Sequence, residues 1–150
     1  MRTVDYIDLK RFMGDWYVIA NIPTIIEKTA HNTVESYRLE ADGSIATTFS
    51  FRDGAFNGEK KVYKPRGFIR DQQSNAVWGM QFLWPFKSDY RVVYLSEDYD
   101  YTIIGRNKRD YVWIMARTPT IPEAEYQHML QVVADLGYNL EDVQKVPQQW

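Results

Sequence analysis

The chain has 150 residues, 45% of them hydrophobic and 15% aromatic, which suits a single folded domain over residues 1–150. Lys and Arg number 18 against 20 Asp and Glu, and a net charge of −2 argues against a nucleic-acid partner. The sequence has no Cys and only 2 His, which excludes disulfides, thiolate metal ligands and a multi-His metal site. We therefore expect one globular domain without a cofactor.

Short runs of alternating apolar residues, separated by turn signals, make up the chain as far as residue 117. Asp42-Gly43 marks one of the turns, and residues 85–89 interrupt the pattern before the sixth run. The spacing predicts eight strands of a β-sandwich or barrel. In chain order they cover residues 16–22, 33–39, 44–52, 60–69, 76–83, 90–95, 101–106 and 111–117, with a further short strand at 143–146.

The hydrophobic period changes after the last of these runs. Pro122 suits the first turn of a helix and Gly137 suits its C-terminal stop, so we predict a helix over residues 123–136. The strand over residues 111–117 is apolar on both faces, so the helix is expected to cover its outer face. The apolar stripe that would make this contact consists of Tyr126, Met129, Leu130 and Val133.

Alternation along the strands assigns their inward faces. It places Tyr90, Val92 and Tyr94 together on one inward face, and Tyr111 and Trp113 on another. A closed sheet of about eight strands has an interior that side chains just fill or that holds one small ligand. Periodicity alone leaves both alternatives open, a fully packed barrel and a barrel with a binding cavity.

Three motifs follow one another along the chain. Gly14-x-Trp16 opens the first strand, Asp98-Tyr99 lies in the turn before the seventh, and Arg117 ends the eighth. Together, in this order, they resemble the signature of the lipocalin family. Three segments look like the branch that contains the bacterial lipocalins and apolipoprotein D, namely residues 11–20, Trp84-Pro85-Phe86 and residues 109–120.

The resemblance implies an all-β fold, an eight-stranded antiparallel up-and-down calyx barrel with one C-terminal α-helix packed outside. Members of this branch carry fatty acids and lysophospholipids outside the cytoplasm, which implies lipid transport or storage at the cell envelope. The expected location is the periplasm or the outer membrane, with secretion as an alternative. Bacterial members are often anchored by a lipidated N-terminal Cys, and neither that Cys nor a signal peptide is found here. Membrane association would then depend on a missing N-terminal anchor. The sequence also leaves open the alternative that the protein forms a homodimer.

The resemblance gives the signature residues a structural role. Trp16 is expected to close the narrow end of the barrel, with the guanidinium of Arg117 over its ring in a cation–π contact worth about 0.5–2 kcal/mol. Asp98 and Tyr99 are expected to fix the nearby turn. Replacing Trp16 should therefore reduce stability far more than ligand specificity.

Alternation and the family pattern together assign a ligand-binding calyx wall. A loop over residues 23–33, carrying Ile25 and Ile26, is expected to form a lid over the open end or simply to anchor itself through these side chains. The predicted wall consists of Glu35, Tyr37, Thr47, Phe49, Trp78, Met80, Phe82, Tyr94, Tyr111 and Trp113.

Glu35 is the one charged residue in this predicted wall. A buried carboxylate without a partner is costly, so two interpretations are open. Glu35 either selects a ligand with a cationic or hydrogen-bonding head group, or forms a structural ion pair with a neighbouring Lys or Arg.

Other functions have less support in the sequence. An enzyme would need a Ser or Thr nucleophile beside His31 or His128, and neither histidine lies in a recognisable motif. Haem ligation could use only His31. A structural or partner-interaction protein with a packed barrel and no lipid ligand is the remaining alternative, and we expect no enzymatic activity.

Overall fold

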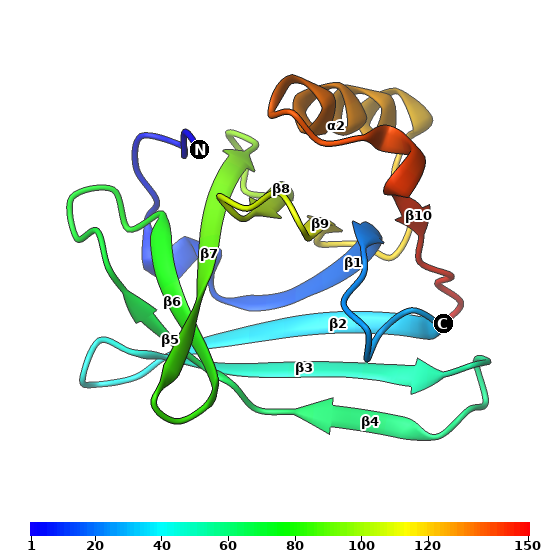
Figure 1. Ribbon diagram of the computed structural model, residues 1–150, viewed down its shortest axis with the longest axis horizontal. Coiled ribbons are helices and arrows are strands. Elements are labelled where there is room, and N and C mark those ends of the chain that lie inside the picture. Colours follow the sequence, from blue (N-terminus) through cyan, green and yellow to red (C-terminus); the bar gives the residue numbers. More distant parts are fainter.

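The computed structural model describes every residue from Met1 to Trp150, and its main feature is one antiparallel sheet that closes on itself (Figure 1). The strands pair in the order β1-β2-β3-β5-β6-β7-β8-β9, and β1 also pairs with β9, which closes the ring. Both β4 and β5 pair with β3, so they share one of eight positions around the barrel. The strands are β1 Gly14–Ile22, β2 Ala30–Leu39, β3 Ile45–Asp53, β4 Lys60–Tyr63, β5 Arg66–Ile69, β6 Val77–Leu83, β7 Phe86–Leu95, β8 Tyr101–Gly105, β9 Val112–Ala116 and β10 Gln144–Lys145. The predicted eight-stranded up-and-down barrel is confirmed.

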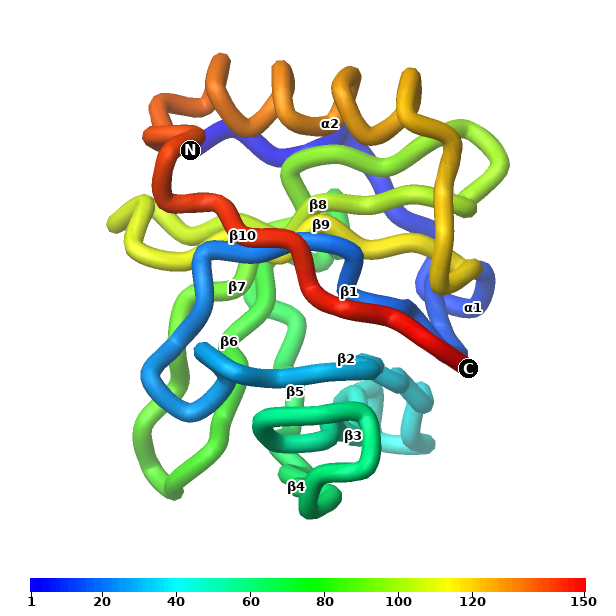
Figure 2. The backbone as a smooth tube through the Cα atoms, turned by 90° about the vertical axis from the view of Figure 1, so that its right-hand side faces the viewer, coloured from blue at the N-terminus to red at the C-terminus, as the bar shows by residue number.

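One long helix, α2 (Glu123–Asp135), packs against the outside of the barrel. Figures 1 and 2 both show it lying over β8 and β9. Met129 and Val133 are fully buried there, in one cluster with Val112 and Ile114 from the outer face of β9. The apolar stripe of α2 is therefore buried against the outer apolar face of β9, as the sequence predicted. None of the helices is both long and apolar enough to cross a membrane.

The last strand, β10, fills a gap beside β1. It pairs with Ala20 and Asn21 on β1, where β2 no longer pairs with that strand. Beyond it, the backbone N–H of Asn32 donates to the carbonyl of Pro147 at 2.8 Å. The short C-terminal strand predicted at residues 143–146 is thus present and completes the wall.

Prolines account for two differences from the predicted strands. The strand expected over residues 60–69 is divided into β4 and β5, because Pro65 has no N–H for the ladder. The interruption expected at residues 85–89 is absent, because Pro85 lies in the turn itself and pairing resumes directly, with Leu83 opposite Phe86. The β6–β7 hairpin therefore extends further than the sequence indicates. A helix that was not predicted, α1 (Leu9–Phe12), precedes β1.

The alternation of β7 is broken by a β-bulge. Val92 pairs with Ile104 while Tyr94 pairs with the adjacent Ile103, so β7 has one extra residue, Val93, at this point. An extra residue moves the following side chains to the opposite face. The inward placement of Tyr94 alongside Tyr90 and Val92 was therefore wrong, because Tyr94 lies outside the barrel.

The narrow end of the barrel is closed by packed aromatic side chains. Trp16 is fully buried and donates a hydrogen bond from Nε1 to the carbonyl of Phe12 at 2.9 Å. The Arg117 guanidinium carbon lies 3.7 Å from the centre of the Trp16 ring, as expected from the signature. Tyr99 occupies a left-handed turn position, and the carboxylate of Asp98 accepts the backbone N–H of Asp100 at 3.1 Å. This end of the barrel offers no space to a ligand.

Candidate ligand-binding cavity

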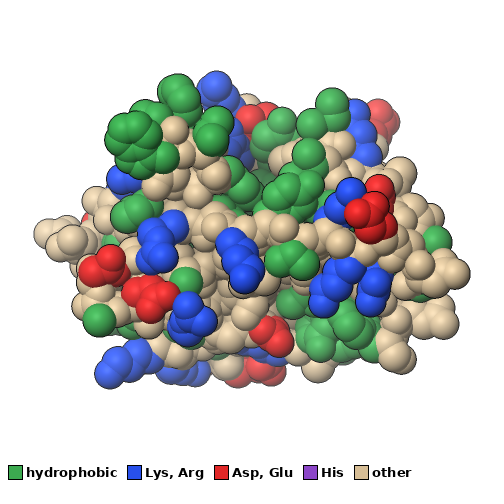
Figure 3. All heavy atoms as spheres, turned by 90° about the horizontal axis from the view of Figure 1, so that it is seen from below, with side chains coloured by type: hydrophobic (Ala, Val, Ile, Leu, Met, Phe, Trp, Pro, Cys, Tyr) green, Lys and Arg blue, Asp and Glu red, His purple; other side chains and the backbone are tan.

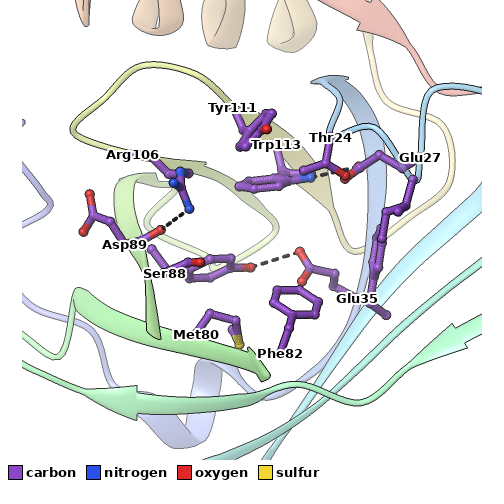
Figure 4. Close-up of a pocket in the computed structure, with 13 residues that line it drawn as sticks. Thr24, Glu27, Glu35, Met80, Phe82, Ser88, Asp89, Arg106, Tyr111 and Trp113 are labelled. Atoms are coloured by element: carbon purple, nitrogen blue, oxygen red, sulfur yellow. Dashed lines mark hydrogen bonds between the residues drawn. The ribbon is translucent and has the colours of Figure 1, made fainter. Parts of the chain in front are cut away.

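A cavity of about 290 Å³ occupies the other half of the barrel (Figure 4). This volume is at the small end of the range for small-molecule sites, roughly 300–1,000 Å³. Its wall combines apolar side chains with a few polar groups. The lining residues are Thr24, Ile26, Glu27, Glu35, Phe49, Met80, Phe82, Ser88, Asp89, Tyr90, Arg106, Tyr111 and Trp113.

The exposed rim of the cavity is mainly apolar, with Ser88 as its one exposed polar residue. Phe82 lines the cavity and is nevertheless 59% exposed, and Ile26, from the loop between β1 and β2, lines it from another side. At the tip of the β6–β7 hairpin, Leu83 and Trp84 are also exposed. Hydrophobic side chains gather along the upper edge of the molecule in Figure 3, most densely at the left, the side of this hairpin. A ligand at the mouth would therefore meet hydrocarbon surface.

The floor of the cavity is polar. Glu35 on β2 and Tyr90 on β7 lie there, and the Tyr90 hydroxyl donates to Glu35 Oε2 at 3.0 Å, one of the dashed bonds in Figure 4. Directly below, Trp78 stacks on the Tyr90 ring at 5.5 Å, and the hydroxyls of Tyr37 and Tyr90 are hydrogen-bonded to each other. Tyr37 and Trp78 belong to the packed core rather than to the cavity.

Burial controls the charge of this floor. Glu35 is only 6% exposed, and the loss of water raises the pKa of its carboxyl to about 7, although the hydrogen bond from Tyr90 opposes this effect. Burial likewise raises the pKa values of Tyr37 and Tyr90 well above their ordinary value, so both hydroxyls stay neutral. Near neutral pH, Glu35 is the group on the floor whose charge changes.

A second carboxylate, Glu27, holds the loop between β1 and β2 against the barrel. It is buried and accepts hydrogen bonds from Asn21 Nδ2 at 2.8 Å, Thr24 Oγ1 at 2.6 Å and Trp113 Nε1 at 3.0 Å. Burial raises its pKa, and these three donors oppose the shift. Three donors satisfy Glu27, which therefore fixes the loop and leaves little capacity for a ligand.

The only Lys or Arg in the lining, Arg106, is already paired. Its Nε and Nη2 donate to the two carboxylate oxygens of Asp110 at 2.8 and 3.2 Å, and its Nη1 donates to the carbonyl of Asp89 at 3.3 Å. Figure 4 shows Arg106 and Asp89 on one side of the cavity and Glu27 and Glu35 on the other. None of the ion pairs in the structure includes Glu35, so the Lys or Arg partner considered for it is absent. The hydrogen-bond partner of Glu35 is instead the hydroxyl of Tyr90.

A family model described as the lipocalin-like domain matches residues 7–148. The chain belongs to the lipocalin family. Temperature-induced lipocalin-1 of Arabidopsis thaliana is 29% identical to it, over 99% of this chain and 83% of that protein. The outer membrane lipoprotein Blc of Citrobacter freundii is 28% identical, over 91% of this chain and 77% of that protein.

Solved lipocalin-like structures have the same fold. Insecticyanin from the tobacco hornworm Manduca sexta superposes with a TM-score of 0.76 at 16% identity, covering 97% of this chain and 83% of that one. The cockroach allergen Per a 4 superposes with a TM-score of 0.70 at 18% identity, covering 99% of this chain and 94% of that one. These likenesses concern the barrel and its outer helix.

The residues predicted for the calyx wall of this lipocalin divide into four groups. Tyr37 and Trp78 lie in the packed core below the floor, and Thr47 is buried and donates to the carbonyl of Ile45 at 3.3 Å. Tyr94 lies outside, where its hydroxyl donates to Glu125 of α2 at 3.1 Å. Six residues line the cavity, namely Glu35, Phe49, Met80, Phe82, Tyr111 and Trp113.

Several lining residues were not predicted. Ser88 and Asp89 were missed because they lie in the part of the β6–β7 hairpin expected to be irregular. Glu27 and Thr24 come from a loop, whose path the strand pattern does not indicate. Tyr90 was placed on an inward face by its phase but was not included in the predicted wall.

Neither histidine of this lipocalin lines the cavity. A ring nitrogen of His31 lies 2.9 Å from the carbonyl of Thr29, and its ring packs edge-on against Phe56. His128 lies on α2 and packs against Tyr94 outside the barrel. No Ser or Thr hydroxyl is hydrogen-bonded to either ring.

Proposed function

We propose that this lipocalin binds one fatty acid or lysophospholipid molecule in its barrel and carries or stores it at the cell envelope. The observation that carries this proposal is the cavity with hydrophobic walls, including Phe49, Met80 and Trp113. Family membership supports a small hydrophobic ligand, and the lipid class is our proposal. No histidine lies where it could activate a nucleophile, so we propose a carrier rather than an enzyme.

The energetics suit a single-chain lipid. Removing about ten methylenes from water gains roughly 8 kcal/mol at about 0.8 kcal/mol each. Loss of translational and conformational freedom opposes this gain. A net affinity near micromolar is expected, with part of the chain in the cavity and part against the exposed rim at Phe82 and Ile26.

The proposed location is the periplasm or the outer membrane. It is supported by the similarity to the Blc proteins of Citrobacter freundii and Escherichia coli, which are outer membrane lipoproteins. A comparison of cell fractions, with an antibody against the full chain, would distinguish an envelope protein from a secreted one.

A fluorescence titration of delipidated protein tests the carrier function. A lysophospholipid and a fatty acid of equal chain length are added separately, and saturable quenching or a blue shift near micromolar ligand is expected. Trp113 lines the cavity and Trp150 is 70% exposed, so Trp113→Phe should remove much of the signal and Trp150→Phe should not. Calorimetry checks that Trp113→Phe still binds. If calorimetry and fluorescence both show no binding of either lipid, the carrier function is wrong.

The exposed hairpin favours partner interaction as a second candidate function. Phe82, Leu83, Trp84 and Phe86 are between 59% and 81% exposed, an unusual density of apolar surface. Light scattering of the wild type and of a Leu83→Ser/Trp84→Ser variant would show whether this surface forms a homodimer. A monomer at every concentration would remove the homodimer from consideration.

A further inference from the structure

The polar groups of the cavity lie at its floor and the apolar groups at its mouth. This is the reverse of the arrangement expected for a carrier that binds the apolar tail of a lipid first. The exposed rim is mainly hydrocarbon, contributed by Phe82 and Ile26, and Ser88 is its one exposed polar residue. The floor is the carboxylate of Glu35 and the hydroxyl of Tyr90. A terminal methyl group that reached the floor would displace solvent from these two polar groups without replacing its hydrogen bonds. The floor is therefore better suited to the polar end of a ligand.

The charges around the cavity point to the kind of polar end. Glu35 and Glu27 lie on one side, and neither forms an ion pair with a Lys or Arg. Arg106 on the opposite side is neutralised by its two bonds to Asp110. Glu27 already accepts three hydrogen bonds, so Glu35 is the carboxylate with capacity for a ligand.

We propose that the cavity takes an amphiphile with its polar end first and selects an ammonium or hydroxyl end over a carboxylate, while the hydrocarbon chain lies against the apolar rim. This inference rests on the proposed function and narrows its ligand class, because it favours a lysophospholipid whose polar end carries an ammonium or hydroxyl group over a fatty acid. An ammonium group would donate hydrogen bonds to Glu35 and neutralise it. A hydroxyl would donate one bond, whereas a carboxylate would bring a like charge beside Glu35 with no donor of its own.

Three probes of twelve carbon atoms each test the selection, namely dodecylammonium, 1-dodecanol and dodecanoate. Calorimetry on the delipidated full chain at pH 8 should rank them in that order. We expect dodecylammonium to bind about tenfold more tightly than dodecanoate, because the two head groups bring opposite charges next to Glu35 and only the ammonium can donate hydrogen bonds to it. This ranking needs no variant, so it tests the proposal even if substitutions in the floor prevent folding.

Glu35→Gln is the matched variant. A Gln can still accept the hydrogen bond from Tyr90, so circular dichroism should show a folded barrel, while the charge is gone. The preference for dodecylammonium over dodecanoate should then fall to less than about threefold, since the Coulomb contribution has been removed. Glu141→Gln, at an exposed position on the surface, removes the same charge and should leave the wild-type preference.

The selection should also depend on pH. Tyr37 and Tyr90 face Glu35 and stay neutral, Glu27 is the second buried carboxylate in the lining, and Arg106 lies opposite, where it is paired with Asp110. Because the pKa of Glu35 is raised to about 7, its charge disappears as the pH falls from 8 to 6. The affinity for dodecylammonium should fall over this interval and that for dodecanoate should rise. Both changes should be much smaller in Glu35→Gln, where only the raised pKa of Glu27 remains.

The outcomes separate the two proposals. Equal affinities for the three probes at pH 8, or a preference for dodecylammonium over dodecanoate that is as large in Glu35→Gln as in the wild type, would overturn the polar-end-first selection and leave the carrier function standing. Tighter binding of dodecanoate than of dodecylammonium would do the same. Binding of none of the probes, nor of a lysophospholipid, would overturn the carrier function itself.

Discussion

At the scale of single residues, the ionisable groups inside the barrel differ in how they are stabilised. Glu27 accepts three hydrogen bonds, whereas Glu35 depends mainly on the Tyr90 hydroxyl. The inward position of Glu35 follows from strand alternation and was predicted. Its partner was not, because Tyr90 comes from β7, on the other side of the barrel, and one sequence does not show which side chains meet across it.

This burial has a consequence for stability as a function of pH. The pKa of Glu35 is about 7 in the folded chain against 4.5 for an ordinary Glu, so the folded state binds the proton more tightly than the unfolded state. The free energy of unfolding should therefore decrease as the pH rises from 5 to 8, by about 3 kcal/mol. Urea denaturation at both pH values measures this difference.

Glu35→Gln is the control, and its stability should change much less over the same interval. The raised pKa of Glu27 leaves a smaller slope of the same sign. Asp71 and Asp98 have lowered pKa values, so they titrate below this interval and do not contribute. If the free energy of unfolding of the wild type instead rises with pH, the assignment of a raised pKa to Glu35 is wrong.

At the scale of secondary structure elements, the periodic pattern predicted the strands and the helix but missed local irregularities. The bulge at Val93 was not predicted, because residues 92–95 are all apolar and fit either face of the strand, and only pairing with β8 shows that one residue is extra. It moves Tyr94 to the outer face, where it meets α2. The contact between α2 and β9 was predictable because both surfaces are apolar and neither has another partner.

The helix contact gives a prediction that separates stability from binding. Met129 is fully buried between α2 and the barrel wall, so Met129→Ala should cost about 2–5 kcal/mol of unfolding free energy. The cavity is on the inner side of the same wall, so lipid affinity should be unchanged. Chemical denaturation and a lipid titration on one preparation measure both quantities.

A milder change on the same surface serves as the comparison. Tyr94→Phe removes only the hydrogen bond to Glu125 and should cost about 0.5–1.5 kcal/mol, again without an effect on binding. A large loss of lipid affinity in Tyr94→Phe would mean that Tyr94 belongs to the binding wall after all.

At the scale of the whole molecule, Arg117 connects segments that are distant in the sequence. Its guanidinium donates to the carbonyls of Asp15 at 2.9 Å, Arg11 at 2.8 Å and Tyr99 at 3.3 Å while covering the Trp16 ring. The family signature predicted the contact with Trp16. The three carbonyl contacts could not be predicted, because they depend on how α1 and the turn at Tyr99 approach the end of β9.

Arg117→Lys should therefore destabilise the entire barrel although the charge is kept. A lysine cannot donate in three directions or lie flat on the indole, so a loss of about 1–3 kcal/mol is expected. Denaturant unfolding measures it, and Arg2→Lys offers a comparison at an exposed arginine. Equal stability of Arg117→Lys and the wild type would show that the charge alone matters at this position.

The pairing of β1 with β9 also bears on how the chain is made. A nascent chain whose β9 segment has not yet emerged from the ribosome has two unpaired strand edges, one on β1 and one on β8. Such edges can pair with the same edges on other chains, so incomplete chains are the species most exposed to aggregation. Pairing of β9 and β10 therefore closes the barrel and also covers the strand edges that promote aggregation. Translation that stalls before residue 112 should reduce solubility far more than loss of α2 from a closed barrel.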